Sequence, residues 1–120
     1  MYGTSNRGNG VHGHSPTGYG VYGTSDSSYA VTGLSGTSGG VAGFSESGHG
    51  AIGVSTTAVG VYGSSGSGRG GRFSGGKAQV RLVPSTSATH PASGEAGDLF
   101  VDRARRLWFC KGGTNWKQLA

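Results

Sequence analysis

The fold is decided by a ten-residue unit, one copy of which reads Val21-Tyr22-Gly23-Thr24-Ser25-Asp26-Ser27-Ser28-Tyr29-Ala30. Seven copies follow one another without insertion, starting at residues 1, 11, 21, 31, 41, 51 and 61. The third slot is glycine and the fifth slot is serine in every copy, and the first slot is valine in five of them. A fixed period of this kind indicates a repeating architecture, in which each unit buries its face only against its neighbours.

Within each unit, the first five slots alternate as in a β-strand, and the last five have the composition of a turn. Slots one, three and five hold small residues and share one face, whereas slots two and four vary and include Tyr22, Leu34 and Phe44. Small invariant residues suit a crowded axis where backbones approach closely, and the serine hydroxyl is expected to cap a backbone group at the corner. The residues expected at this axis are Val11, Gly13, Val21, Gly23, Val31, Gly33, Val41, Gly43, Gly53, Val61 and Gly63.

Composition alone would favour disorder, because 27 of the 120 residues are glycine and only 32% are apolar. The strict register argues against a flexible linker, which has no reason to keep the same slots in every copy. Burying one valine cannot offset the entropy lost in ordering ten residues, so a single unit cannot fold alone. Cys110 is the only cysteine, which excludes an intrachain disulfide and leaves oligomerisation as the expected remedy.

The pattern changes after residue 70. Residues 71–77 are rich in glycine and arginine, and we expect them to form a flexible neck. Four short apolar segments at 78–84, 97–102, 107–110 and 115–119 predict strands, with a hairpin around residues 103–106. Their expected core is Leu99, Phe100, Val101, Leu107, Trp108, Phe109 and Trp116.

Units such as Gly20-Val21-Tyr22-Gly23-Thr24-Ser25 and Gly60-Val61-Tyr62-Gly63-Ser64-Ser65 resemble the trimeric β-helical shafts of phage tail fibres, tailspikes and bacterial surface fibres. The resemblance covers residues 1–70 and implies an intertwined homotrimeric β-helix or β-prism without lateral strand edges. Residues 78–120 resemble the Gly-Asp-Leu-x-Val-Asp, Leu-Trp-x-Cys and Trp terminal pieces that follow such repeats in bacterial and phage proteins. We therefore expect an all-β fold, with a shaft over 1–70, a neck over 71–77 and a trimerisation cap over 78–120.

The basic residues gather towards the C-terminal end. Residues 1–68 hold Arg7 against Asp26 and Glu46, a net charge of −1, and residues 69–120 hold nine basic against three acidic residues, a net charge of +6. Either the cap carries a solvated hairpin tip, or this charge contacts an anionic receptor such as a cell-surface glycan. The candidate contacts are Arg103, Arg105, Arg106 and Lys111. The single Arg69-Gly70-Gly71-Arg72 run does not predict nucleic-acid binding.

No catalytic constellation stands out, and we expect neither enzyme activity nor a cofactor. Matches to Gly-x-Gly-x-x-Gly, such as residues 8–13, are by-products of the period and lack a strand–helix context. His12 and His14 share a strand face and are weak candidates for a metal site, but their outward slots favour solvated rings. His90 is expected to be a polar loop residue, and Cys110 a small buried one.

A structural fibre segment, in a virion or outside the cell, is the function that this pattern favours. Two alternatives remain: a bacterial adhesin that binds through outer tyrosines, and a glycan-degrading tailspike. The tailspike would need clustered carboxylates, but Asp26 and Glu46 lie two units apart. No run of apolar residues predicts membrane insertion, and Met1 occupies a valine slot, so we expect the chain to be a segment of a longer shaft.

Overall fold

The structure is a computed structural model that describes residues 3–120 and contains three β-strands and no helix in that range. The predicted all-β class is confirmed by these strands and the absence of helices among the described residues. The trimeric β-helix stays a prediction, because the structure holds a single chain. The chain divides into two compact units at the Gly60–Val61 boundary. No helix among these residues is long and apolar enough to cross a membrane.

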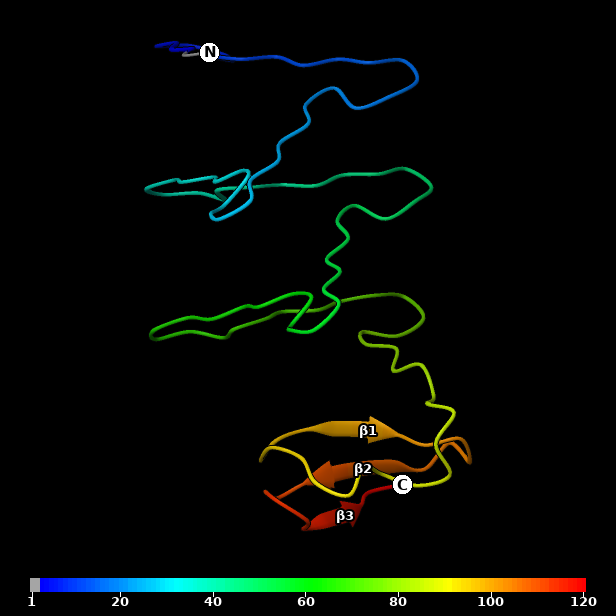
Figure 1. The fold of residues 1–120 in the computed structure, drawn as a ribbon. Coiled ribbons are helices and arrows are strands. Elements are labelled where there is room, and N and C mark those ends of the chain that lie inside the picture. The colour runs from blue at the N-terminus through cyan, green and yellow to red at the C-terminus, as the bar shows by residue number, and fades with distance from the viewer. Residues whose placement is uncertain (1–2) are drawn as a thin grey trace. The chain divides into compact units, whose positions relative to one another are not determined.

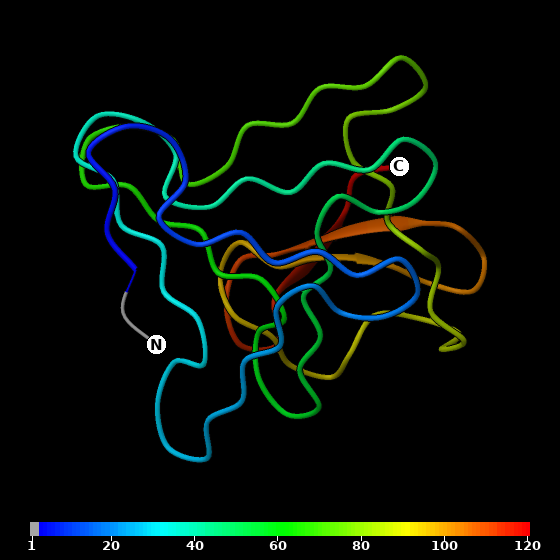
Figure 2. The same cartoon turned by 90° about the horizontal axis from the view of Figure 1, so that it is seen from above.

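The repeats follow an extended path that bends at slots six to eight and again at slot ten of each unit. Both views draw them as plain tube without arrows (Figure 1 and Figure 2), because residues 3–70 form no strand. Residues 3–84 make no backbone–backbone hydrogen bond. The valines of the first slot are 57–77% exposed. The strand-like alternation of the sequence is therefore present as an extended backbone that lacks a pairing partner.

The invariant serine closes the bend of each unit. In six units, the Oγ atom of slot five accepts a hydrogen bond from the backbone N–H of slot eight at 2.9–3.1 Å, as in Ser15–Gly18 and Ser45–Gly48. The first unit differs, since Ser5 Oγ accepts from the N–H of Arg7 at 3.2 Å. This is the cap of a backbone group that the sequence predicts, and alanine in slot five would remove its acceptor.

Slots three and ten of the same unit lie against each other. A Cβ atom at Gly23 would fall 3.0 Å from the Ala30 carbonyl oxygen, and a Cβ atom at Gly20 would fall 2.8 Å from the Gly13 carbonyl oxygen. Side chains do not tolerate such distances, so glycine permits this approach of two backbone segments. The crowding predicted for slot three thus exists inside one chain, and the packing of these glycines on a three-fold axis stays a prediction.

The cap ends in a three-stranded antiparallel sheet with the order β1-β2-β3 (Figure 1). Strand β1 is Leu99–Val101, β2 is Leu107–Cys110 and β3 is Trp116–Gln118. Phe100 lies opposite Trp108, and Phe109 lies opposite both Leu99 and Lys117. The hairpin predicted around residues 103–106 and the last predicted strand are therefore confirmed.

Residues 78–84 do not form the strand that the sequence predicts. Val80, Leu82 and Val83 are 59%, 41% and 74% exposed, and this segment has no backbone partner. A strand needs a neighbouring ladder, and residues 3–120 supply none here. The chain that follows instead covers one edge of the sheet, because the Ser85 N–H donates to the Val101 carbonyl and the Arg103 N–H donates to the Ser87 carbonyl, both at 2.8 Å.

The close approach of slots three and ten gives a matched test on two glycines. In Gly33→Ala, the new Cβ would lie 2.5 Å from Val41 Cγ2, whereas Gly36→Ala would place its Cβ in open space. Overpacking costs about 1–3 kcal/mol per site, so Gly33→Ala should lower the melting temperature followed by circular dichroism. Gly36→Ala should leave it unchanged or raise it slightly, and equal melting temperatures for the two variants would contradict the close approach.

Candidate assembly surfaces

The chain exposes far more surface than its mass requires. Its accessible surface is 11049 Å² for 12.0 kDa, whereas a compact monomer of that mass exposes about 6000 Å². The repeats contribute much of the excess, because their valines are exposed and their backbone groups are unpaired. Exposed apolar surface beside free strand-like backbone is the surface that an adjoining chain covers in β-structures.

The described residues of the repeats include no cluster of candidate metal ligands. His12 and His14 are exposed, and no set of three or more His, Cys, Asp and Glu in the described part of the chain could hold a metal ion. The same residues enclose no pocket. The one side-chain pair of note is Tyr19 and Tyr22, whose rings stack with centroids 5.2 Å apart while both remain exposed.

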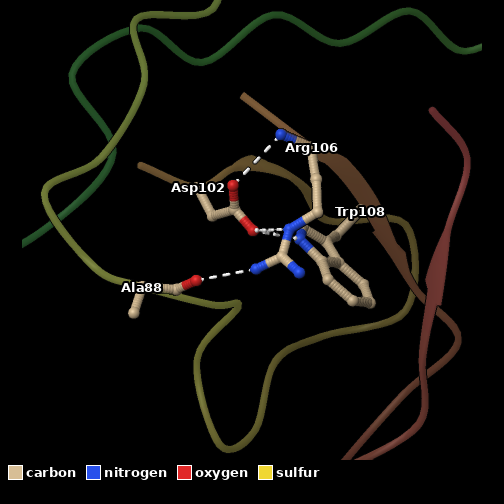
Figure 3. A network of polar contacts seen from close by, with 4 residues as sticks. All are labelled: Ala88, Asp102, Arg106 and Trp108. Carbon is tan, nitrogen blue, oxygen red and sulfur yellow. Dashed lines mark hydrogen bonds and ion pairs between the residues drawn. The ribbon is translucent and has the colours of Figure 1, made fainter. Parts of the chain in front are cut away.

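The cap is organised around a buried carboxylate, that of Asp102 (Figure 3). Its Oδ2 atom accepts hydrogen bonds from Arg106 Nε at 2.7 Å and from Trp108 Nε1 at 2.9 Å, and its Oδ1 atom accepts from the Arg106 backbone N–H at 3.0 Å. The Arg106 guanidinium also donates to the Ala88 carbonyl at 2.8 Å. One acidic side chain therefore joins the hairpin turn, β2 and the loop before β1.

These contacts determine the ionisation of Asp102. Burial opposes the charged form and would raise the pKa. The hydrogen bonds from Trp108 and from the backbone and side chain of Arg106, with the charge of Arg106, outweigh burial and lower the pKa from 3.8 to about 2. The carboxylate is consequently charged at neutral pH, and it holds Arg106 in place.

His90 lies between the two tryptophans of the cap. Its ring is edge-on to Trp108 with centroids 4.5 Å apart, and stacks on Trp116 with centroids 5.2 Å apart. Phe100 meets Trp116 edge-to-face at 6.4 Å. His90 lies in a loop, as the sequence predicts, and its ring is in addition a packing contact of both tryptophans. Nothing in its local sequence signals this contact, because its ring partners are 18 and 26 positions away.

The expected core of the cap divides between two faces of the sheet. Phe100, Trp108 and Trp116 lie on the face covered by His90. Because strand side chains alternate, Leu99, Val101, Leu107 and Phe109 lie on the other face. Only Asp102 and Cys110 are fully buried among the described residues, so the sequence prediction of a buried Cys110 is confirmed. On the second face Leu99 is 54% exposed, while Val101, Leu107 and Phe109 are part-buried.

The arginine-rich tip of the hairpin contains a strained residue. Arg105 has a φ of 66°, in the left-handed region, where its N–H donates to the Asp102 carbonyl at 2.9 Å. Of the four candidate anion contacts, Arg103, Arg105 and Lys111 are exposed. Arg106 is instead engaged by Asp102 and lies 5.4 Å over the ring of Trp108. No local pattern in the sequence signals this structural role of Arg106.

No protein-family model, curated protein or solved structure matches the chain.

The lowered pKa of Asp102 makes the cap sensitive to acid. A carboxyl whose pKa is lower in the folded than in the unfolded chain stabilises the fold above the unfolded value and loses that contribution as pH falls towards the folded value. The melting temperature of the cap, followed by tryptophan fluorescence, should therefore drop between about pH 4 and pH 2. Asp102→Asn should lower the neutral-pH melting temperature and flatten this decline, whereas Glu95→Gln, at an exposed carboxylate, should retain it.

The strain at Arg105 predicts a stabilising substitution. A left-handed conformation costs a residue with a Cβ about 1–2 kcal/mol, and glycine avoids most of that cost. Arg105→Gly should therefore stabilise the cap by about 1 kcal/mol in thermal or denaturant unfolding. Arg103→Gly, at a neighbouring exposed position without a positive φ, should not. Stabilisation of both variants, or of neither, would argue against strain at Arg105.

Proposed function

We propose that the chain is a structural fibre segment: a homotrimer in which residues 1–70 form an intertwined β-helical shaft and residues 78–120 form a trimerisation cap. The observation that carries this proposal is that residues 3–84 have no backbone hydrogen-bond partner in their own chain. Extended backbone that packs into a structure must pair its N–H and C=O groups. The partners are therefore other chains.

Copies of the same chain are the best-fitting partners. A chain with the same ten-residue spacing presents an extended segment, a serine-capped bend and a glycine crossing at every level. Three copies close a prism without leaving free edges, and closed symmetry is the usual form of homo-oligomers. The excess surface of about 5000 Å² over a compact monomer is of the size that obligate interfaces bury.

The activity of such a fibre is mechanical. A shaft of identical units is a spacer whose length scales with the number of units, and it belongs in a virion tail fibre or an extracellular surface fibre. The exposed charges of Arg103, Arg105 and Lys111 provide a contact for an anionic receptor at the cap. The favoured role uses no cofactor and no chemistry of bond formation or cleavage.

The stacked tyrosines support a second candidate, a surface adhesin. Tyr19 and Tyr22 are 81% and 74% exposed, and they form a small aromatic platform on the repeats. Aromatic rings with exposed hydroxyls are suited to contacts that are partly apolar and partly polar. Glycan binding that depends on both rings, in the absence of any virus particle, would favour the adhesin over a plain spacer.

Sedimentation of the full chain tests the proposal. At micromolar concentration we expect one species with three times the chain mass of 12.0 kDa. We also expect a β-type circular dichroism spectrum that weakens to the signal of the three-stranded cap sheet when the trimer dissociates. The dependence on assembly arises because strand pairing of the repeats is expected only between chains. A monodisperse monomer, or a β spectrum that is independent of concentration and mass, would overturn the fibre.

A further inference from the structure

One face of the cap sheet packs against His90, and the other carries two half-exposed leucines, Leu99 and Leu119. Phe100, Trp108 and Trp116 pack beneath His90. The opposite face, which we call the open face, consists of Leu99, Val101, Leu107 and Phe109, with Leu119 beside Leu107. Leu99 and Leu119 are 54% and 52% exposed, while the other three are part-buried.

We infer that the open face is the surface through which the caps of three copies contact one another. The inference rests on the proposed homotrimer and names the interface that would hold its end together. Leu99 and Leu119, at two ends of this face, are otherwise left half in water. Burial of apolar surface is the main favourable term in association, so covering this face would stabilise both the cap and the assembly.

The cap has a small core of its own. Its only fully buried residues are Asp102 and Cys110. Cys110 is an unpaired thiol, and the described residues offer no metal cluster. Domains this small rely on disulfides, metals or association, so association is the means left to this one. The shaft would also bring three caps to the same level, which raises their effective concentration.

Charge on the cap favours a second copy over an acidic partner. The exposed arginines Arg103 and Arg105 lie in the turn that joins β1 to β2, not among the apolar residues of the open face. On that face Lys117 is the only charged residue, and it lies on β3, an outer strand of the sheet. An apolar centre with charge at the rim is the composition of homo-oligomer interfaces.

Thiol footprinting of the full chain tests the contact. Leu99→Cys and Leu119→Cys would place a thiol on the open face, and Thr114→Cys would place one on an exposed turn of the same cap. In the assembled protein, we expect a maleimide reagent to modify the first two at least ten-fold more slowly than the third. The native Cys110 is fully buried and provides the background rate.

A charge variant checks the same surface independently. Leu99→Lys with Leu119→Lys alters two side chains that a single chain leaves half in water, so the monomer fold should survive. We expect the concentration at half-assembly to rise at least ten-fold, with the environment of Trp108 and Trp116 unchanged in fluorescence at low concentration.

The outcomes separate this inference from the proposed function. If the wild-type chain is trimeric and the thiols at 99, 114 and 119 react at equal rates, the open face is not the contact, although the fibre stands. Unchanged assembly of the double lysine variant would likewise exclude the open face as the contact. If the wild-type chain is a monomer, the fibre and the cap contact both fall.

Discussion

Backbone hydrogen bonding is the constraint on which the rest of this molecule depends. The repeats fix their local geometry well: the slot-five serine satisfies the slot-eight N–H, and glycines let slots three and ten of one unit meet. These devices use one backbone donor in each unit and leave the remaining groups of residues 3–84 without a backbone partner in the chain. Packed β-structure cannot leave such groups unpaired. Each unit therefore forms its bend within one chain but leaves its extended backbone unpaired. This is what is expected of a chain that folds only when it associates with others.

The cap, unlike the repeats, pairs its backbone within one chain but has little apolar core. It has too few residues for a large apolar core, and at its centre it uses a carboxylate where a larger domain would use apolar side chains. Asp102 receives three hydrogen bonds from Arg106 and Trp108, and Arg106 extends the network to Ala88. A satisfied polar network in a small fold fixes orientation more than it adds stability, because each buried polar group has first lost its water. The network therefore fixes how the hairpin, the loop and the sheet of the cap are arranged. Apolar side chains such as Leu99 and Leu119 stay half exposed and are available for contact with another chain.

The sequence predicts what depends on local pattern. The alternation in residues 97–102 and 107–110 and the turn between them place the hairpin correctly, and the invariant serine correctly predicts a backbone cap, because these interactions join residues close in sequence. It fails where distant residues meet. His90 between Trp108 and Trp116, and Arg106 on Ala88, depend on how a long loop folds over the sheet. Residues 78–84 have strand composition and form no strand, since composition cannot supply the partner that a ladder needs. The division of the predicted core into two faces follows from the alternation of side chains along each strand.

Periodicity explains why such a chain would carry a cap at all. Every unit presents the same slots, so three shafts displaced by one unit would make nearly the same contacts as three in register. In the proposed trimer, the repeats would favour association of the chains but would not determine their register. The cap has no such ambiguity, because its contacts join unlike residues in one order, and they are short in sequence separation except for the loop that carries His90. Local contacts form quickly, and long-range pairing between chains is slow. A cap that folds from local contacts and then joins its copies through one apolar face would bring three chains together in register before the repeats begin to pair, and the shaft could grow from that end.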